Sequence, residues 1–179
     1  HHVAIVTGAS SGIGRAVAEA MAAAGAAVVI NYHSQEAPAD DLAERIVAAG
    51  GRASVIQADV ADENDVARLF NETVDAYGRV DIVVCNSGVQ KDASVAEMTL
   101  EDWNTVIEVN LTGQFLCARE AVRRFRAQPR RGRPAMRSAA APPTPVTTGP
   151  RPLFRSSSCR WAPRASVSRY VRRSAASGR

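Results

Sequence analysis

The stretch Thr7-Gly8-Ala9-Ser10-Ser11-Gly12-Ile13-Gly14 decides how the sequence is interpreted. It follows a β-branched run over residues 3–7 that predicts a strand, and it leads into an amphipathic pattern that predicts a helix over about residues 12–24. Glycines at such a turn let the backbone approach phosphate groups, and the N-terminus of the helix offers unpaired N–H groups with a partial positive charge. The stretch therefore indicates a dinucleotide-binding turn, although glycine-rich turns also serve as simple helix entries.

Short apolar runs alternate with helical patterns over residues 1–126. The expected strands cover residues 3–7, 27–31, 53–58 and 81–85. Further helices are expected from Pro38, after the N-cap Asp62, and after a capping box that starts at Thr99, the last running through Val122. This alternation is typical of βαβ units. It predicts an α/β fold, namely a Rossmann-type doubly wound parallel sheet in the order 3-2-1-4, truncated after the fourth strand and the following helix.

The composition changes sharply near Phe125. Residues 1–120 hold all 18 acidic residues and seven basic ones, whereas residues 121–179 hold fifteen arginines and no acid. Eight of the nine prolines fall in residues 129–163, without a sustained helical or strand period. We therefore predict a folded domain over residues 1–126 and a disordered segment over residues 127–179, because the latter cannot bury enough apolar surface to offset chain entropy.

Two explanations of the basic segment remain open. Its abrupt enrichment in Arg, Pro, Ala and Ser favours a frameshift in a GC-rich gene shortly after Phe125. The alternative is a real tail that attracts nucleic acid or another polyanion. Nucleic acid is the less favoured partner, because Phe154, Trp161 and Tyr170 are isolated rather than regularly spaced as in stacking modules.

Hydropathy and cysteine usage narrow the class of protein. The sequence has no apolar run long enough to span a membrane and no signal-peptide pattern, so we expect a protein that is neither exported nor membrane-bound. The three cysteines, Cys85, Cys117 and Cys159, form no C-x-x-C pair and no metal-ligand cluster. They indicate a reducing cytoplasm and no metal site. For Cys85 and Cys117 we expect structural burial rather than nucleophilic work.

Polar residues follow three further predicted strands at their carboxyl ends. They are Asn31-Tyr32-His33, Asp59-Val60 and Asn86-Ser87-Gly88. A doubly wound sheet places its ligand crevice outside these strand ends, next to the glycine-rich turn. The sequence therefore predicts that all four groups surround one nucleotide site.

Four motifs resemble the short-chain dehydrogenase/reductase family in order and spacing: TGASSGIG at 7–14, DV at 59–60, NSG at 86–88 and NLTG at 110–113. Family members usually have Asn-Asn-Ala-Gly where this chain has Cys85-Asn86-Ser87-Gly88. The resemblance covers residues 3–126. It implies an oxidoreductase that uses NAD or NADP and transfers a hydride to or from a small-molecule alcohol or carbonyl.

Within the family, several segments look like those of glucose 1-dehydrogenases: residues 28–32, 102–104, 106–107, 110–113, 115–116 and 119–121. This resemblance implies a sugar substrate and homotetramers. Related carbonyl and acyl-carrier-protein reductases share much of the pattern, so other substrates stay open. With no strand expected beside the fourth, this chain is expected to expose a sheet edge and to associate rather than form a defined tetramer.

The resemblance assigns roles at the nucleotide site. The pyrophosphate would be cradled by the glycine-rich turn, through Gly8, Ser10, Ser11, Gly12, Ile13 and Gly14. Asp59 would accept a hydrogen bond from the adenine amino group, and Val60 would pack beside the ring. The nicotinamide-side ribose would be lined by Asn86, Ser87 and Gly88.

The end of the second strand decides between cofactors, because an acid there repels the 2′-phosphate of NADP. This chain has Asn31 and His33 instead, so NAD and NADP are both permitted. His33 would replace an arginine common in the resembling enzymes and donate to the phosphate, or it is simply a solvated loop histidine. Arg15 is interpreted as a surface residue rather than a phosphate ligand.

Most of the catalytic residues implied by the resemblance are missing. Asn110 would be the helix-kinking asparagine whose backbone carbonyl holds a water of the proton relay, or else a plain helix-surface residue. The family's Tyr-x-x-x-Lys pair is absent, and Lys91 is the only lysine. Tyr170 follows Ser157 at the family's serine-to-tyrosine spacing, but Ser174 stands where the lysine belongs. We therefore expect this chain to be catalytically incomplete.

Overall fold

The computed structural model describes residues 1–129, which lie in one compact unit. The strands are β1 (Val3–Val6), β2 (Ala27–Tyr32), β3 (Arg52–Gln57) and β4 (Ile82–Val84). The helices are α1 (Gly12–Ala23), α2 (Glu36–Ala48), α3 (Glu63–Tyr77), α4 (Leu100–Ile107) and α5 (Gly113–Ala127), with a π-helical segment η1 (Glu108–Thr112) between the last two. The predictions on the frameshift, on disorder beyond residue 129 and on Ser157 and Tyr170 lie outside the described residues.

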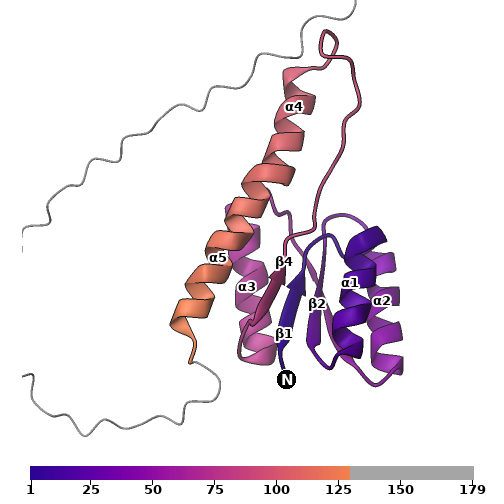
Figure 1. Cartoon of the computed structure of the whole chain (residues 1–179), viewed down its shortest axis with the longest axis vertical. Helices are drawn as coiled ribbons and strands as arrows, with labels where there is room; N and C mark the ends of the chain where they lie inside the picture. Colours follow the sequence, from indigo (N-terminus) through magenta and orange to yellow (C-terminus); the bar gives the residue numbers. More distant parts are fainter. Residues whose placement is uncertain (130–179) are drawn as a thin grey trace, which may run out of the picture. The chain divides into compact units, whose positions relative to one another are not determined.

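The four strands form one parallel sheet in the order β3-β2-β1-β4, which confirms the predicted order. Val6 of β1 pairs with Ile30 of β2 on one side and with Val84 of β4 on the other. Helices α1 and α2 lie on one face of the sheet, and α3 and α5 on the other, as in a doubly wound fold (Figure 1). All four strands therefore point their carboxyl ends toward the same edge.

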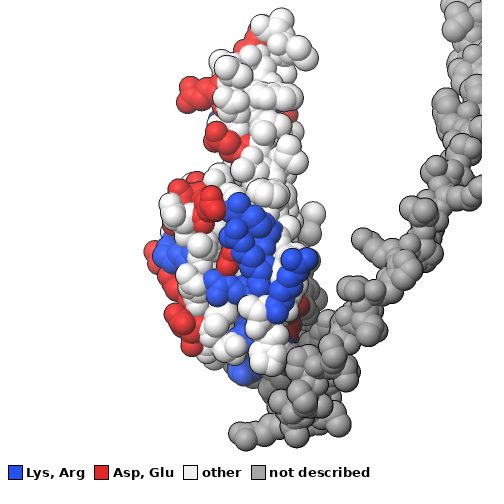
Figure 2. Space-filling view, turned by 90° about the vertical axis from the view of Figure 1, so that its left-hand side faces the viewer, with Lys and Arg blue, Asp and Glu red and all other residues white. Residues whose placement is uncertain are grey.

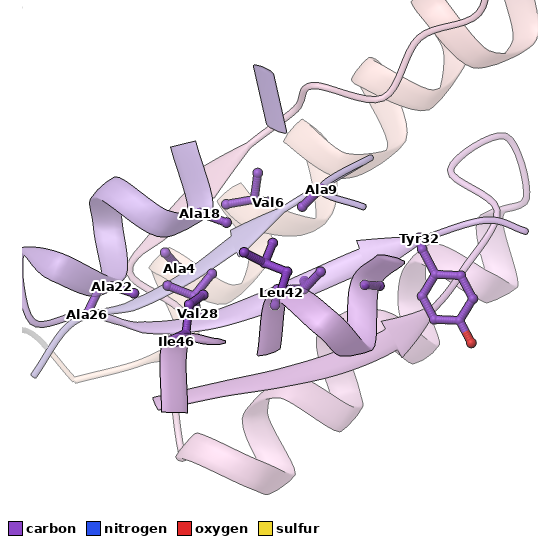
Figure 3. Close-up of a cluster of buried hydrophobic side chains, with 12 residues drawn as sticks. Ala4, Val6, Ala9, Ala18, Ala22, Ala26, Val28, Tyr32, Leu42 and Ile46 are labelled. Atoms are coloured by element: carbon purple, nitrogen blue, oxygen red, sulfur yellow. The ribbon is translucent and has the colours of Figure 1, made fainter. Parts of the chain in front are cut away.

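Two apolar clusters hold the helices to the sheet. The first lies beneath α1 and α2, where alanines of α1 pack beside Leu42 and Ile46 of α2 (Figure 3). The second lies beneath α3 and α5 and contains Leu69, Phe70 and Leu116. All residues of β1 and β2 are buried. Along each strand, cluster members alternate: Ala4, Val6, Val28 and Ile30 belong to the first cluster, and Ile5 and Val29 to the second. These two strands are continuous apolar runs in the sequence because both of their faces are covered.

Two helix boundaries differ from the sequence prediction. Helix α2 begins at Glu36 and contains Pro38 in its first turn, where the missing N–H of proline has no intrahelical partner to lose. The single long helix expected after Thr99 is interrupted, because α4 changes to a π-helical hydrogen-bond pattern at Glu108 and α5 resumes at Gly113. π-Helical turns of this kind are rare and are frequent at functional sites.

Helix α4 extends past the strand ends and packs less than the other elements (Figure 1). No residue of α4 or η1 is buried, and Leu100, Trp103 and Leu111 are exposed. On the face seen in Figure 2, basic side chains gather on the sheet-bearing part, whereas the projecting helix has a mostly uncharged surface with scattered acids. Strand β4 is one edge of the sheet within the described residues, the other being β3, and each residue of β4 is partly exposed.

Candidate nucleotide-binding site

A cavity of about 590 Å³ opens at the carboxyl ends of the strands. Nine of the twelve predicted cofactor residues line it: Gly8, Ser10, Ser11, His33, Asp59, Val60, Asn86, Ser87 and Gly88. The other three, Gly12, Ile13 and Gly14, lie in the first turn of α1 and do not line it. Cavities of about 300–1,000 Å³ accommodate small ligands and cofactors. The predicted strand-end groups are thus brought together around a space of suitable size.

The glycine-rich turn presents the N-terminus of α1 at this cavity. Gly8 and Gly12 have positive φ angles of 61° and 57°, a backbone conformation that glycine adopts without strain. Ser11 is the N-cap of α1, and its side chain makes no capping hydrogen bond. The first-turn N–H groups therefore have no side-chain acceptor from their N-cap, and the helix dipole favours a phosphate at this end.

Gly14 has a packing role at this turn. A Cβ at this position would lie 2.5 Å from the carbonyl oxygen of Gly8 and 2.5 Å from Nδ2 of Asn86. That Nδ2 donates to the carbonyls of Thr7 and Gly8, at 3.0 and 3.1 Å. The Thr7 hydroxyl accepts from the N–H groups of Asn86 and Ser87, at 2.9 and 3.0 Å. The loop after β4 is therefore bonded to the turn after β1, and Gly14 leaves the space for this contact.

The side chain of Asn31, which is 1% exposed, joins the ends of three strands. Its Oδ1 accepts from the N–H of Gly8 at 3.3 Å. Its Nδ2 donates to the carbonyls of Tyr32, Ile56 and Ala58, at 3.2, 3.3 and 3.1 Å. Asn31 is thus engaged with the backbone and is not available to contact a cofactor. This role was not predicted from the sequence. The one signal for it was a single amide side chain within an otherwise apolar strand.

His33 and Asp59 face each other at the end of the cavity beside β2 and β3. The Nε2 of His33 lies 3.8 Å from the Oδ2 of Asp59, and their side chains are 69% and 41% exposed. The other carboxylate oxygen of Asp59 accepts from the N–H of Ala61 at 2.9 Å. Both side chains therefore keep polar atoms directed at solvent, where a ligand can reach them.

Asp65 of α3 holds the Asp59 turn in place, and the sequence did not reveal this. Its Oδ2 accepts from the backbone N–H of Asp59 at 2.9 Å, and its Oδ1 accepts from Arg68 at 2.9 Å. The bond from the backbone N–H, followed by that from the guanidinium, lowers the pKa of Asp65 below its ordinary value of 3.8. The carboxylate is therefore ionised at neutral pH and fixes the backbone that presents Asp59.

Helix α5 approaches the same loops through residues at its N-terminus. A Cβ on Gly113 would lie 2.9 Å from Cγ2 of Val60, so only glycine allows the helix this close to the turn after β3. Gln114 donates from Nε2 to the carbonyl of Ser87 at 3.0 Å. The glycine of the NLTG motif and the following glutamine therefore position two walls of the cavity.

Asn110 lies in η1, where the helix departs from α-helical geometry. Its Oδ1 accepts from the N–H of Val89, and its Nδ2 donates to the carbonyl of Val89, both at 2.8 Å. This paired contact, which sequence reasoning did not foresee, clamps the loop after β4 to the helix. A role for the Asn110 carbonyl in a proton relay stays a prediction.

Few charges surround the cavity. His33 is the only basic side chain that lines it within residues 1–129, whereas Asp59 and Glu108 are acidic. Arg15 does not line the cavity and instead bonds to the carbonyl of Pro38 and the carboxylate of Asp41, tying α1 to α2. Binding of phosphate groups here would therefore depend on backbone N–H groups and on His33 rather than on a cluster of arginines.

The described part of the chain has neither a candidate metal site nor a candidate membrane span. Residues 1–129 contain no group of three or more His, Cys, Asp and Glu side chains that could hold a metal ion. None of their helices combines the length and apolar character needed to cross a membrane.

The sheet order, the glycine-rich turn and the cavity at the switch in strand order are those of a Rossmann-type α/β fold. A family profile described as short chain dehydrogenase matches residues 2–134, and the chain belongs to this family of NAD(P)-dependent oxidoreductases. It is 45% identical over 131 residues to a protein of Synechocystis named 3-oxoacyl-[acyl-carrier-protein] reductase, covering 73% of this chain and 53% of that protein. It is 46% identical over 119 residues to an uncharacterized oxidoreductase of Methylorubrum extorquens, covering 66% and 48%.

Solved structures of dehydrogenases/reductases are also similar to this chain. A dehydrogenase/reductase from Sinorhizobium meliloti superposes with a TM-score of 0.67 at 38% identity, over 69% of this chain and 49% of the other. A short-chain dehydrogenase/reductase variant from Serratia marcescens superposes with a TM-score of 0.67 at 34% identity, over 69% and 50%. The chain thus spans about half the length of the curated relatives that it matches.

Proposed function

We propose that this chain binds NAD or NADP in the cavity at the strand ends. The observation that carries the proposal is the convergence of nine predicted cofactor residues on one cavity beside the N-terminus of α1. Its volume suits a cofactor, and its walls are fixed by the hydrogen bond that Asn31 accepts from Gly8 and by those that Asn86 and Gln114 donate. Membership of the oxidoreductase family supports the same ligand.

The proposed orientation follows from the chemistry of each wall. The first turn of α1 and the backbone of Gly8 would bind the pyrophosphate through N–H groups. Asp59 would accept from the adenine amino group, and Asn86 and Ser87 would line the nicotinamide-side ribose. When bound, the nicotinamide ring supplies or accepts a hydride. Asn110 would hold the loop after β4 against that end of the cofactor through its two bonds to Val89.

We infer that the cavity accepts NADP as well as NAD. No acid stands at the end of β2, and His33 is the basic group nearest to that wall of the cavity. A protonated or N–H-donating imidazole can bond to a 2′-phosphate, while the neighbouring Asp59 opposes a second negative charge at the same place. His33 therefore determines how much affinity the 2′-phosphate adds.

The proposed substrate class is inferred from similar proteins of the family. A relative is named for the reduction of a 3-oxoacyl group, and several segments resemble glucose 1-dehydrogenases, so an alcohol or carbonyl compound, including a sugar, is the proposed substrate. The chain itself lacks the Tyr-x-x-x-Lys pair that would transfer the proton. We therefore propose nucleotide binding without efficient turnover for this chain, in the cytoplasm and without the family's tetramer.

Titration of the full chain with NADH and NADPH, followed by nicotinamide fluorescence, tests the proposal. We expect saturable binding of both, with weak salt dependence. His33→Ala should weaken NADPH binding by about 3- to 10-fold and leave NADH binding unchanged, as for the loss of one partly exposed charged hydrogen bond. Val95→Ala, which alters a fully exposed loop residue, is the matched control. Absence of saturable binding would refute the nucleotide site.

A further inference from the structure

Cys85 and Cys117 are far apart in the sequence and adjacent in the fold. Cys85 directly follows β4, and Cys117 lies on the buried face of α5. Both belong to the apolar cluster between the sheet and α3 and α5, in which Cys117 is 1% exposed and Cys85 is partly buried. Between the same two segments, Gln114, one turn before Cys117, donates to the carbonyl of Ser87, two residues after Cys85, at 3.0 Å, so α5 is in contact with the chain that follows β4. The predicted burial is found for Cys117 and in part for Cys85, and the sequence did not indicate that the two cysteines lie in one cluster.

The two members of the pair differ in reactivity. The hydrogen bond from Cys117 lowers the pKa of Cys85 to about 7, against the opposing effect of partial burial. The hydrogen bond to Cys85 and burial both raise the pKa of Cys117. A thiolate is the reactive form of cysteine, and Cys85 is the more accessible of the two. Cys85 is thus suited to be attacked first and Cys117 to resolve the product.

We propose that Cys85 and Cys117 are a redox pair that closes into a disulfide when a hydroperoxide oxidises Cys85. The Cys85 thiolate attacks the terminal peroxide oxygen, forming an S–O bond and breaking the O–O bond, and the leaving oxygen takes a proton. The sulfur of Cys117 then attacks the Cys85 sulfenic acid, forming the S–S bond and breaking the S–O bond. The released hydroxide takes the Cys117 proton as water, so the peroxide is reduced by two electrons and the pair is oxidised by two.

The disulfide would connect α5 to the end of β4 beside the proposed nucleotide site. Cys85 precedes Asn86, whose side chain bonds to the turn after β1. Cys117 lies one helical turn after Gln114, which bonds to the carbonyl of Ser87. A covalent link at this place would fix the helix and the loop that at present are joined by single hydrogen bonds. The proposal itself requires only the two thiols and is independent of nucleotide binding.

The test uses the full chain carrying Cys159→Ser, so that only the two cysteines of the pair remain. The protein is treated with hydrogen peroxide at equimolar to tenfold excess, and the remaining thiols are alkylated and counted by mass spectrometry. We expect both thiols to be lost together, with the loss of two hydrogens and no added oxygen. Peptide mapping should recover the Cys85–Cys117 linkage in monomeric protein, and a dithiol reductant should restore both thiols.

Three controls make the result decisive. Cys117→Ser should leave Cys85 as a sulfenic or sulfinic acid, whereas Cys85→Ser should leave Cys117 unoxidised. Oxidation in denaturing urea should give the disulfide at least tenfold more slowly, because the fold no longer holds the sulfurs together. Oxidation of Cys85 with Cys117 still alkylatable, linkage between two chains, or equal rates in urea and in buffer would each overturn the proposal.

Discussion

The residues of β1 and β2 are all buried, whereas each residue of β4 is partly exposed and α4 has no buried residue. The first region is held by two apolar clusters, one on each face of the sheet. The loop and helix after β4 depend more on individual polar contacts, such as those from Asn110 to Val89 and from Gln114 to Ser87. The first region therefore supplies most of the packing and the proposed pyrophosphate end of the site, and the second supplies the proposed nicotinamide end.

The largest expected effect is on the rate of turnover, because the chain has the proposed nucleotide site but no Tyr-x-x-x-Lys pair. With NAD or NADP as cofactor, we expect neither a 3-oxoacyl compound nor glucose to be turned over above background. General acid–base groups contribute about 100- to 10,000-fold each, and several are missing. Following NAD(P)H absorbance at high protein concentration measures this.

A comparison variant decides what any residual activity means. Tyr170 is the one tyrosine with a serine at the family's spacing, so Tyr170→Phe is made alongside the unchanged chain. Turnover at an ordinary enzymatic rate would contradict the prediction. If that turnover were lost in Tyr170→Phe, the proton donor would lie in the basic segment.

The next effect is a difference in hydrogen exchange between the two regions. Amides of β1 and β2 should be protected at least about a thousandfold more than those of α4, because local opening of an unburied helix needs little free energy. Helix α3, which buries four residues on the sheet, serves as the internal control and should resemble the strands. Equal protection of α4 and β1 would show that another part of the chain or a second copy covers the projecting helix, and a dilution series would distinguish these.

Two glycines of the same turn give a smaller and more local contrast. Gly14→Ala should lower the free energy of unfolding by about 3 kcal/mol, because its Cβ would meet Gly8 and Asn86 and separate the two regions. Gly12→Ala should lower it by only about 1 kcal/mol, since that Cβ meets nothing and only the positive φ is strained. Denaturant unfolding measures both values. A larger loss for Gly12→Ala would mean that backbone strain, not the contact with Asn86, limits this turn.

The sequence was sufficient for the sheet order and for most of the cavity lining. Regular apolar periods and helix-ending glycines such as Gly78 mark the elements, and parallel strands must bring their carboxyl ends together. The supporting bonds were not predictable in this way. The partners of Asn31, Asp65 and Gln114 are backbone groups distant in sequence, and no local pattern specifies them. That Cys85 and Cys117 lie in one cluster likewise depends on how α5 packs on the sheet.

The smallest expected effect is a pH dependence that belongs to the well-packed region. The folded pKa of Asp65 lies below 3.8, so its carboxylate adds stability that is fully present above the unfolded value and is lost as the pH falls through the folded value. Asp65→Asn should therefore lower the free energy of unfolding by about 1 kcal/mol at pH 6 and by progressively less below about pH 4, because the side chain is partly exposed. Asp75→Asn, at an exposed position of the same helix, should change it by less than about 0.5 kcal/mol at either pH. Urea unfolding from pH 6 to pH 3 measures the difference, and an Asp65→Asn deficit that did not shrink on acidification would mean that the hydrogen bond to Asp59 depends on shape rather than on charge.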